Sequence, residues 1–325
     1  MSKTLLELQE VTKIFESRIF FRKQRVIAVE KVSFSISAEK PSILALAGES
    51  GSGKTTIARL ILGFIKPTSG KILYKSKDIW NMDKKEWMNF RKEVQAIFQD
   101  PYSSFNPLLK VDRVLTIPVR KFCLADSRDE IYDLIARALD EVGLRAEDVL
   151  GKYPHELSGG ERQRIMLARA FLVKPKLIIA DEPVSMIDAS LRANILNTML
   201  NLKRKHNTSF LYITHDLSTA RYVSDEIAIM YLGNILEMGA ADDVILKPLH
   251  PYVKLLLESV PEPNPDKRWR TRINLPRTEL NKQLSKGEGC KFYDRCPTKM
   301  EICAKEKPKL IEIDKRLVFC HLYCS

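Results

Sequence analysis

Long apolar runs are missing from this sequence of 325 residues. Its longest apolar stretches, such as residues 42–47 and 177–180, fall far short of the roughly 18 residues that a helix needs to cross a bilayer. Residues 1–10 contain no apolar core and include Glu7 and Glu10, so they are not typical of a secretory signal. We therefore expect a chain that does not span a membrane and that stays in the cytoplasm.

Cysteine is scarce in most of the chain. Of the six cysteines, Cys123 stands alone and the other five fall within residues 290–325. In a reducing cytosol such a cluster favours a metal site over a disulfide framework. The clustered residues are Cys290, Cys296, Cys303, Cys320 and Cys324.

The composition carries no mark of disorder, because 45% of the residues are hydrophobic and 29% are charged, as in an ordinary globular chain. A length of 325 residues suits a large α/β domain with an appendage, or two modest domains. The net charge of +12 favours a negatively charged partner, such as nucleic acid or the anionic face of a membrane. Charge alone does not choose between them.

Short apolar strand patterns alternate with helical patterns through the middle of the chain. Such alternation predicts a largely parallel sheet. The expected strands are residues 42–47, 177–180 and 209–214, and the expected helices are residues 55–62, 161–173 and 190–204.

Three further regions define the organisation. For residues 5–37 we expect short strands around a basic, aromatic insert at 18–25, which is either a solvated loop or a membrane-facing contact. Apolar residues recur at spacings of three and four positions in residues 129–142, so a helical insertion is expected at about 101–160. Prolines 261, 263 and 265 mark a boundary, so we divide the chain into residues 1–258 and 259–325.

A glycine-rich turn separates the first of these strands from the first helix. Its sequence, Gly48-Glu-Ser-Gly-Ser-Gly-Lys54-Thr55, fits the phosphate-binding loop, in which backbone N–H groups surround phosphate oxygens at a helix N-terminus. We expect Lys54 to contact the β- and γ-phosphates and Thr55 to ligate Mg²⁺. The predicted ATP-binding residues of the loop are Gly48, Ser50, Gly51, Ser52, Gly53, Lys54, Thr55 and Thr56.

Two carboxylates, Asp181 and Glu182, end the strand expected at 177–180. Asp181 would lie beside the phosphate-binding loop, where it can bind ATP through Mg²⁺. Glu182 is then free to orient and deprotonate an attacking water as general base. A carboxylate at a strand end is often only solvated, but Lys54 in the same chain favours the catalytic interpretation.

The segment Leu157-Ser-Gly-Gly-Glu-Arg-Gln-Arg164 lies between these two motifs, and its paired glycines can present bare N–H groups to an anion at the start of a helix. An ordinary helix cap at Ser158 would leave the second glycine unexplained. The octapeptide resembles the signature motif of the ABC ATPase family, which faces the γ-phosphate held by the opposite subunit and so implies a dimer. The residues that match are Leu157, Ser158, Gly159, Gly160, Glu161 and Gln163.

Weaker elements of the same family follow in order. By resemblance, Gln99 senses Mg²⁺ and the membrane partner, and His215 reads the γ-phosphate, so both are candidate catalytic residues. Asp188 lies in the loop that links the two sites of the dimer, although Ser185-Met-Ile-Asp is bulkier than the usual Ser-Ala-Leu-Asp. Phe15 matches the aromatic position that stacks on adenine, but an aromatic residue in an edge strand belongs to the core at least as often.

Residues 98–107, residues 250–257 and the terminal cysteines make the resemblance narrower, because together they look like the peptide-permease branch of ABC importers. The resemblance implies an α/β fold with a P-loop NTPase core, a mainly parallel sheet, an antiparallel β-subdomain, a helical insertion and a small cysteine-rich C-terminal region. Residues 1–258 would form the nucleotide-binding domain.

The resemblance also implies an assembly at the cytoplasmic face of a membrane. Its members would be a second, non-identical ATPase subunit, two membrane permeases and an extracellular solute-binding protein. ATP on Lys54, Thr55 and Phe15 of one subunit would meet Ser158 and Gly160 of the other, and closure would drive the permeases.

Several alternatives stay open or are disfavoured. The branch includes importers of peptides, oligosaccharides and nickel, so the solute is not determined. The cysteine segment argues against an exporter ATPase. One cassette with no heptad run argues against an ABC protein acting on nucleic acid, so no nucleic-acid partner is expected.

The terminal cysteines have no spacing that identifies a metal. Five, six and sixteen residues separate Cys290, Cys296, Cys303 and Cys320, whereas zinc sites and bacterial ferredoxins use shorter gaps. Buried thiols that pack as small hydrophobes are one explanation. By resemblance, however, these four residues bind a four-iron four-sulfur cluster, with Zn²⁺ as the alternative and Cys324 as a possible substitute for Cys320. We expect a small metal-dependent module outside the ATP site.

Overall fold

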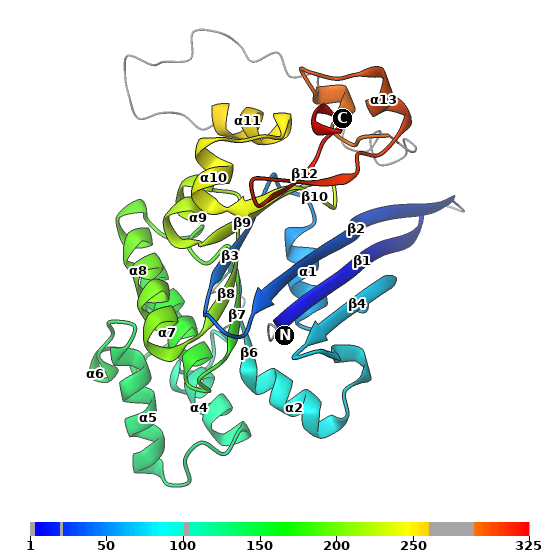
Figure 1. Cartoon of the computed structure of the whole chain (residues 1–325). Helices are drawn as coiled ribbons and strands as arrows, with labels where there is room; N and C mark the ends of the chain where they lie inside the picture. The colour runs from blue at the N-terminus through cyan, green and yellow to red at the C-terminus, as the bar shows by residue number, and fades with distance from the viewer. Residues whose placement is uncertain (1–3, 20–21, 101–104, 260–288, 325) are drawn as a thin grey trace, which may run out of the picture.

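Two β-sheets and their surrounding helices make up the chain in the computed structural model, which describes residues 4–19, 22–100, 105–259 and 289–324 (Figure 1). The larger sheet has eight strands in the order β11-β12-β10-β9-β3-β8-β7-β6. Strands β6, β7, β8, β3 and β9 run parallel, which confirms the mainly parallel sheet. The strands are β3 (Ile43–Ala47), β6 (Val94–Ile97), β7 (Leu177–Asp181), β8 (Ser209–Thr214), β9 (Glu226–Tyr231), β10 (Asn234–Ala240), β11 (Leu310–Ile313) and β12 (Arg316–Phe319).

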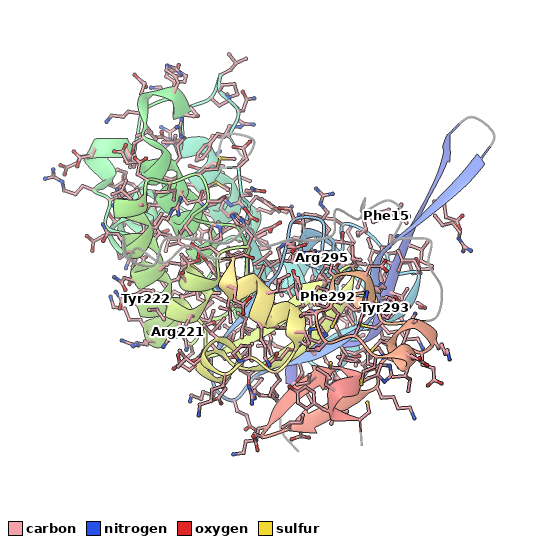
Figure 2. The ribbon with its side chains drawn as sticks, turned by 90° about the horizontal axis from the view of Figure 1, so that it is seen from above. Phe15, Arg221, Tyr222, Phe292, Tyr293 and Arg295 are labelled. Carbon is pink, nitrogen blue, oxygen red and sulfur yellow. The ribbon has the colours of Figure 1, made fainter. Side chains whose placement is uncertain are left out.

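The smaller sheet is antiparallel, with the order β2-β1-β4-β5. Its strands are β1 (Thr4–Ile19), β2 (Arg22–Ser37), β4 (Ser69–Tyr74) and β5 (Lys77–Asp78). The short strands around a loop that we expected are instead one long hairpin, whose outer part projects beyond its neighbours in Figure 2. Backbone pairing of the two strands continues to Ile19 opposite Arg22.

Helices join and cover the strands. The helices around the main sheet are α1 (Lys54–Ile61), η1 (Ile79–Asn81), α2 (Lys84–Glu93), α7 (Gly159–Phe171), α8 (Ala189–His206), α9 (Leu217–Val223), α10 (Ala241–Leu246) and α11 (Pro251–Glu258). The helical insertion contains α4 (Asp112–Lys121), α5 (Arg128–Asp140), α6 (Ala146–Val149) and η2 (Pro154–Glu156), which lie together at the lower left of Figure 1. No helix of the described residues is long and apolar enough to cross a membrane.

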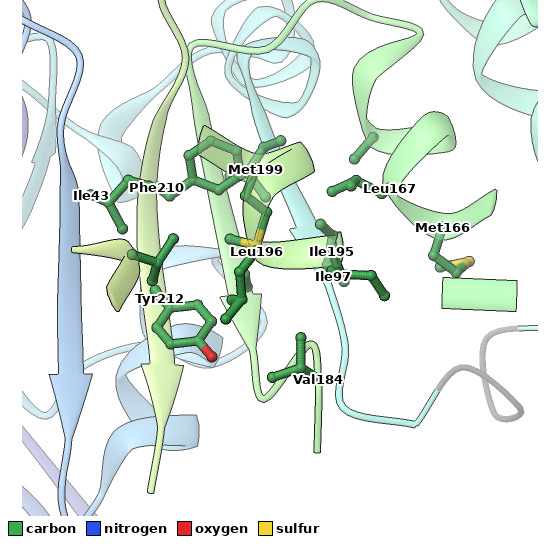
Figure 3. Close-up of a cluster of buried hydrophobic side chains, with 14 of the residues drawn as sticks. Ile43, Ile97, Met166, Leu167, Val184, Ile195, Leu196, Met199, Phe210 and Tyr212 are labelled. Atoms are coloured by element: carbon green, nitrogen blue, oxygen red, sulfur yellow. The ribbon is translucent and has the colours of Figure 1, made fainter. Parts of the chain in front are cut away.

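The main sheet has a hydrophobic core on each face, because successive side chains of its strands point to opposite sides. On one face Leu44 and Leu46 pack with Ile57 of α1 and with the antiparallel sheet. On the other face Phe210 and Tyr212 pack with α7 and α8, as Figure 3 shows. Helices α1 and α7 therefore lie on opposite faces of the same sheet.

The C-terminal region is not a separate appendage. Strand β12 pairs with β10 and β11 with β12, so residues 310–319 extend the main sheet. The described part of the region, residues 289–324, also contains the short helices η4 (Tyr293–Arg295), α13 (Glu301–Lys305) and η5 (His321–Tyr323). The expected linker with its three prolines, the start of the helical insertion at 101–104, and residues 287 and 288 lie outside the described residues.

Candidate active site

The phosphate-binding loop connects β3 to α1, and at two of its positions only glycine fits. Gly48 has φ +147° and Gly53 has φ +107°, a region that side chains rarely adopt. A Cβ atom at Gly48 would lie 2.1 Å from the carbonyl oxygen of Met230, and one at Gly53 would lie 2.3 Å from that of Ala28. The backbone of the loop is therefore pressed against neighbouring strands.

Lys54 lies buried at the centre of this loop. Its Nζ donates to the carbonyl oxygens of Gly48 at 2.8 Å and Glu49 at 2.9 Å. Burial lowers the pKa of Lys54, and the negative charges of Glu182, Asp181 and Glu49 oppose that shift. The ammonium group thus lies where phosphate oxygens would meet the N-terminus of α1.

Asp181 ends β7 and is 7% exposed. Burial raises its pKa, while a hydrogen bond from the Thr55 side chain opposes the rise. Its Oδ1 is buried and has no hydrogen-bond partner among the residues that the structure describes. A buried carboxylate oxygen without a partner next to a threonine hydroxyl fits the oxygen ligands that Mg²⁺ prefers.

Glu182 is the centre of a cluster of three polar side chains. Its Oε1 lies 2.9 Å from His215 Nδ1, and its Oε2 accepts from Gln99 Nε2 at 3.0 Å. The backbone of Glu182 has φ +47°, an uncommon conformation for a residue other than glycine, and its N–H donates to Ile213 at 2.8 Å. Three candidates that are far apart in the sequence are thus brought together beside the loop.

The signature segment opens α7. Ser158 caps the helix by accepting from the Glu161 N–H at 3.2 Å, and Glu161 accepts in return from the Ser158 N–H at 2.8 Å. Leu157 and Gly160 are buried, whereas Ser158 is exposed and Gly159 is half-buried. Gln163 is 2% exposed, and in the described part of the chain neither of its amide atoms has a hydrogen-bond partner. This segment lies across the sheet from α1.

Two other predicted residues lie at the surface. Phe15 is 42% exposed on β1, with the Lys13 ammonium 5.2 Å from the centre of its ring, so the core alternative is excluded for it (Figure 2). Asp188 is exposed at the start of α8 and makes no side-chain cap there.

The four predicted cysteine ligands line one small cavity of about 10 Å³, together with His250 and Phe292. Burial raises the pKa of Cys290 to about 11 and also raises that of Cys320. Cys324 is exposed. Within the described residues, no group of three or more His, Cys, Asp or Glu side chains is arranged to hold a metal ion.

Comparisons with known proteins identify the family. Residues 29–185 match the family described as ABC transporter, and residues 236–303 match the oligopeptide/dipeptide transporter C-terminal region. The oligopeptide transport ATP-binding protein AppF of Bacillus subtilis is 41% identical over 99% of this chain and 98% of its own. The chain belongs to the ABC transporter ATP-binding proteins.

Other comparisons agree with this family. The di/tripeptide transport ATP-binding protein DppF of Pseudomonas aeruginosa is 39% identical over 98% of each chain. The ATP-binding cassette MJ0796, solved as a dimer with ADP and Pi, has a TM-score of 0.64 at 25% identity, over 73% of this chain and 98% of its own. As a member of the family the chain is an ATPase, and the predicted P-loop ATPase fold is confirmed.

One contact of the ATPase site was not anticipated from the sequence. Arg295 of η4 donates to both carboxylate oxygens of Glu49, at 2.8 and 2.9 Å. The C-terminal module that we expected outside the ATP site therefore touches the phosphate-binding loop at Glu49. The two residues stand 246 positions apart, and nothing in the local pattern of either one signals the pair.

Proposed function

We propose that this chain is the ATP-binding and ATP-hydrolysing subunit of an ABC importer for peptides or related solutes. The observation that carries the proposal is similarity over nearly the whole chain to proteins named for oligopeptide and di/tripeptide transport, including the C-terminal region. Importers of oligosaccharides or nickel from the same branch are the alternative.

Each site residue has a proposed role in binding or hydrolysing ATP. Lys54 and the loop N–H groups hold the phosphates, with Ser50, Gly51, Ser52 and Thr56 in the same loop, and Phe15 stacks on the adenine. Thr55, Asp181 and Gln99 hold Mg²⁺, which would supply charge neutralisation at the phosphates. Glu182 takes the proton of the attacking water, and its contact with His215 keeps the carboxylate oriented.

A dimer completes the site. The phosphate-binding loop and the signature segment lie on opposite faces of one sheet, so the signature helix of a second subunit is needed to cover the nucleotide. Ser158 and Gly160 of that subunit would present N–H groups to the γ-phosphate. Asp188, which is exposed at the start of α8, would connect the two sites of the dimer.

The assembly is a further part of the proposal. The partner is a second, non-identical ATPase, and two membrane permeases and an extracellular solute-binding protein complete the importer. The chain would lie at the cytoplasmic face of the membrane, and nucleic acid would not be among its partners. Residues 1–258 form the nucleotide-binding domain, with the helical subdomain at about 101–160, and residues 259–325 form the C-terminal region.

An iron–sulfur cluster on Cys290, Cys296, Cys303 and Cys320 is the finer proposal for that region. Support comes from the four side chains that line one cavity. Within the described residues no group of side chains is arranged to hold a metal ion, so either metal would require the thiolates to rearrange. Zinc, with its thiolates about 2.3 Å from one ion, is the second candidate.

Metal analysis after anaerobic purification tests this point. About four irons per chain with matching sulfide would support the cluster. One zinc per chain would favour the zinc site. Protein without metal would mean that the thiols serve only in packing.

ATP-driven uptake tests the function. The chain is co-expressed with the transporter subunits encoded beside it, and the complex is reconstituted in vesicles with the solute-binding protein. We expect uptake of a labelled peptide that requires Mg-ATP and is lost with Lys54→Ala. Uptake of nickel or an oligosaccharide instead would select the alternative, and a fully active homodimer would contradict the non-identical partner.

A further inference from the structure

Arg295 and Glu49 form a bidentate ion pair between the C-terminal region and the phosphate-binding loop. The side chain of Arg295 is 16% exposed and that of Glu49 is 36% exposed, so the pair is partly shielded from water. Two parallel N–H to oxygen bonds fix the relative orientation of guanidinium and carboxylate, which a single bond does not. This contact is therefore more specific than most surface ion pairs.

Aromatic packing determines where Arg295 lies. Phe292, three residues earlier, is 1% exposed and its ring centre lies 5.5 Å from that of Tyr231 and 5.4 Å from that of Tyr252. The Arg295 guanidinium lies 5.6 Å from the Tyr231 ring centre. In Figure 2 Phe292, Tyr293 and Arg295 lie together on one short segment. These aromatic contacts hold the guanidinium in place beside the loop.

Glu49 is the residue through which this contact reaches the loop. Its carbonyl oxygen accepts from the Lys54 Nζ at 2.9 Å and from the Ser52 N–H at 3.2 Å. Its own N–H donates to the Tyr252 hydroxyl at 3.2 Å. The position of Glu49 therefore affects both the turn of the loop and the lysine at its centre.

Charge gives the contact a second effect. Glu49 brings a carboxylate into a loop that binds phosphates, and its negative charge acts on Lys54. An unpaired carboxylate there would repel an incoming polyphosphate and compete for the lysine. The guanidinium of Arg295 cancels that charge through its two bonds to the carboxylate.

We propose that Arg295 is a positioning residue for ATP binding, which holds the Glu49 carboxylate and cancels its charge beside the phosphate-binding loop. Through it, the C-terminal region contributes to nucleotide affinity. The inference rests on the proposed role of Lys54 and its loop in holding the phosphates.

A double-mutant cycle on the full chain tests the proposal. The probe is a fluorescent ATP analogue with Mg²⁺, and equilibrium affinity is measured for wild type, Arg295→Gln, Glu49→Gln and the double variant. We expect Arg295→Gln to weaken binding by about 3- to 10-fold, as for a partly exposed charge pair. Glu49→Gln and the double variant should bind with the same affinity as each other, because no carboxylate is left for Arg295 to hold or neutralise.

A conservative variant and a matched control sharpen the result. Arg295→Lys keeps the charge without the bidentate geometry, so we expect an intermediate affinity. Lys307→Gln removes another ion pair between the same region and the rest of the chain, the one with Glu30, and should leave affinity unchanged. Thermal unfolding of every variant shows whether the region is still folded.

Two outcomes would overturn the inference. One is an affinity loss in Arg295→Gln that persists when residue 49 is glutamine, because a merely structural role would behave in this way. The other is unchanged affinity in Arg295→Gln. Lys54→Ala distinguishes a wrong inference about Arg295 from a wrong assignment of the ATP site. If Lys54→Ala also binds the ATP analogue normally, the loop itself is wrongly assigned.

Discussion

The phosphate-binding loop and the C-terminal cysteine region touch through Glu49 and Arg295, yet they are built in different ways. The loop motif consists of eight consecutive residues, 48–55, the last two of which begin α1, and the backbone conformation of its glycines shapes it. The cysteine region collects residues 290–320 and is attached by β12 and by the buried ring of Phe292. Changes in the loop should therefore alter nucleotide chemistry, whereas changes in the C-terminal packing should alter stability first.

Removal of the Phe292 ring should have the largest effect on stability. Phe292→Ala leaves a cavity among Tyr231, Tyr252 and His250, and we expect the free energy of unfolding of the C-terminal region to fall by about 3–5 kcal/mol. Hydrogen exchange of residues 289–324 measures the loss. Ile302→Ala, at a side chain that is 43% exposed, is the matched control and should change little. Equal effects of both variants would show that Phe292 is no anchor.

Glu182→Gln should leave the packing intact and stop the chemistry. The amide keeps the shape of the side chain but cannot accept the proton of water, so turnover should fall about 10²-fold or more while ATP still binds. Phosphate release and nucleotide affinity are measured in parallel, and the trapped state should be a closed dimer. Glu226→Gln, on β9 of the same sheet, serves as the control. Normal turnover in Glu182→Gln would remove this residue from the catalytic role.

Acid should weaken the C-terminal packing through His250. Burial lowers the pKa of His250 to about 4 from an ordinary 6.5, and its Nδ1 accepts from the Tyr252 N–H at 3.0 Å. The neutral ring therefore contributes stability above pH 6.5, and this is lost as the pH falls towards 4, by about 2–3 kcal/mol.

The pH dependence is read from unfolding midpoints between pH 7 and 4. His250→Asn keeps a helix-capping acceptor that does not titrate, so its stability should vary less over this range. A variant with the same pH profile as wild type would assign the effect to other groups.

The glycines of the loop should respond individually, with smaller effects. Gly53→Ala meets the Ala28 carbonyl oxygen at 2.3 Å, and strain of about 1–3 kcal/mol should weaken ATP binding by about 5- to 100-fold. Gly51→Ala, at φ +80°, meets nothing within 4 Å, so it should suffer only the conformational penalty. Comparison of the ATP affinities of the two variants separates the effect of the steric clash from the effect of the positive φ angle. Equal losses of affinity would mean that the close approach of Gly53 to Ala28 is unimportant.

Local motifs made much of the site predictable. The loop, the carboxylate pair at the end of β7 and the signature segment are contiguous, and each motif adjoins the strand or helix that positions it. By contrast, the sequence left the insert at 18–25 open between a solvated loop and a membrane-facing contact. Its described residues continue the hairpin, because strand pairing depends on the partner backbone and not on polarity alone.

By itself, the sequence determined the family, the order of strands and helices around the nucleotide loop, and the candidates Gln99, Glu182 and His215, because short-range periodicity and contiguous motifs encode these features. Only the tertiary structure decided that the three side chains meet, that residues 310–319 extend the main sheet, and that Arg295 binds Glu49. These contacts join residues tens to hundreds of positions apart. They arise because the hydrophobic cores on the two faces of the sheet bring distant segments together, and no local pattern of side chains records that approach.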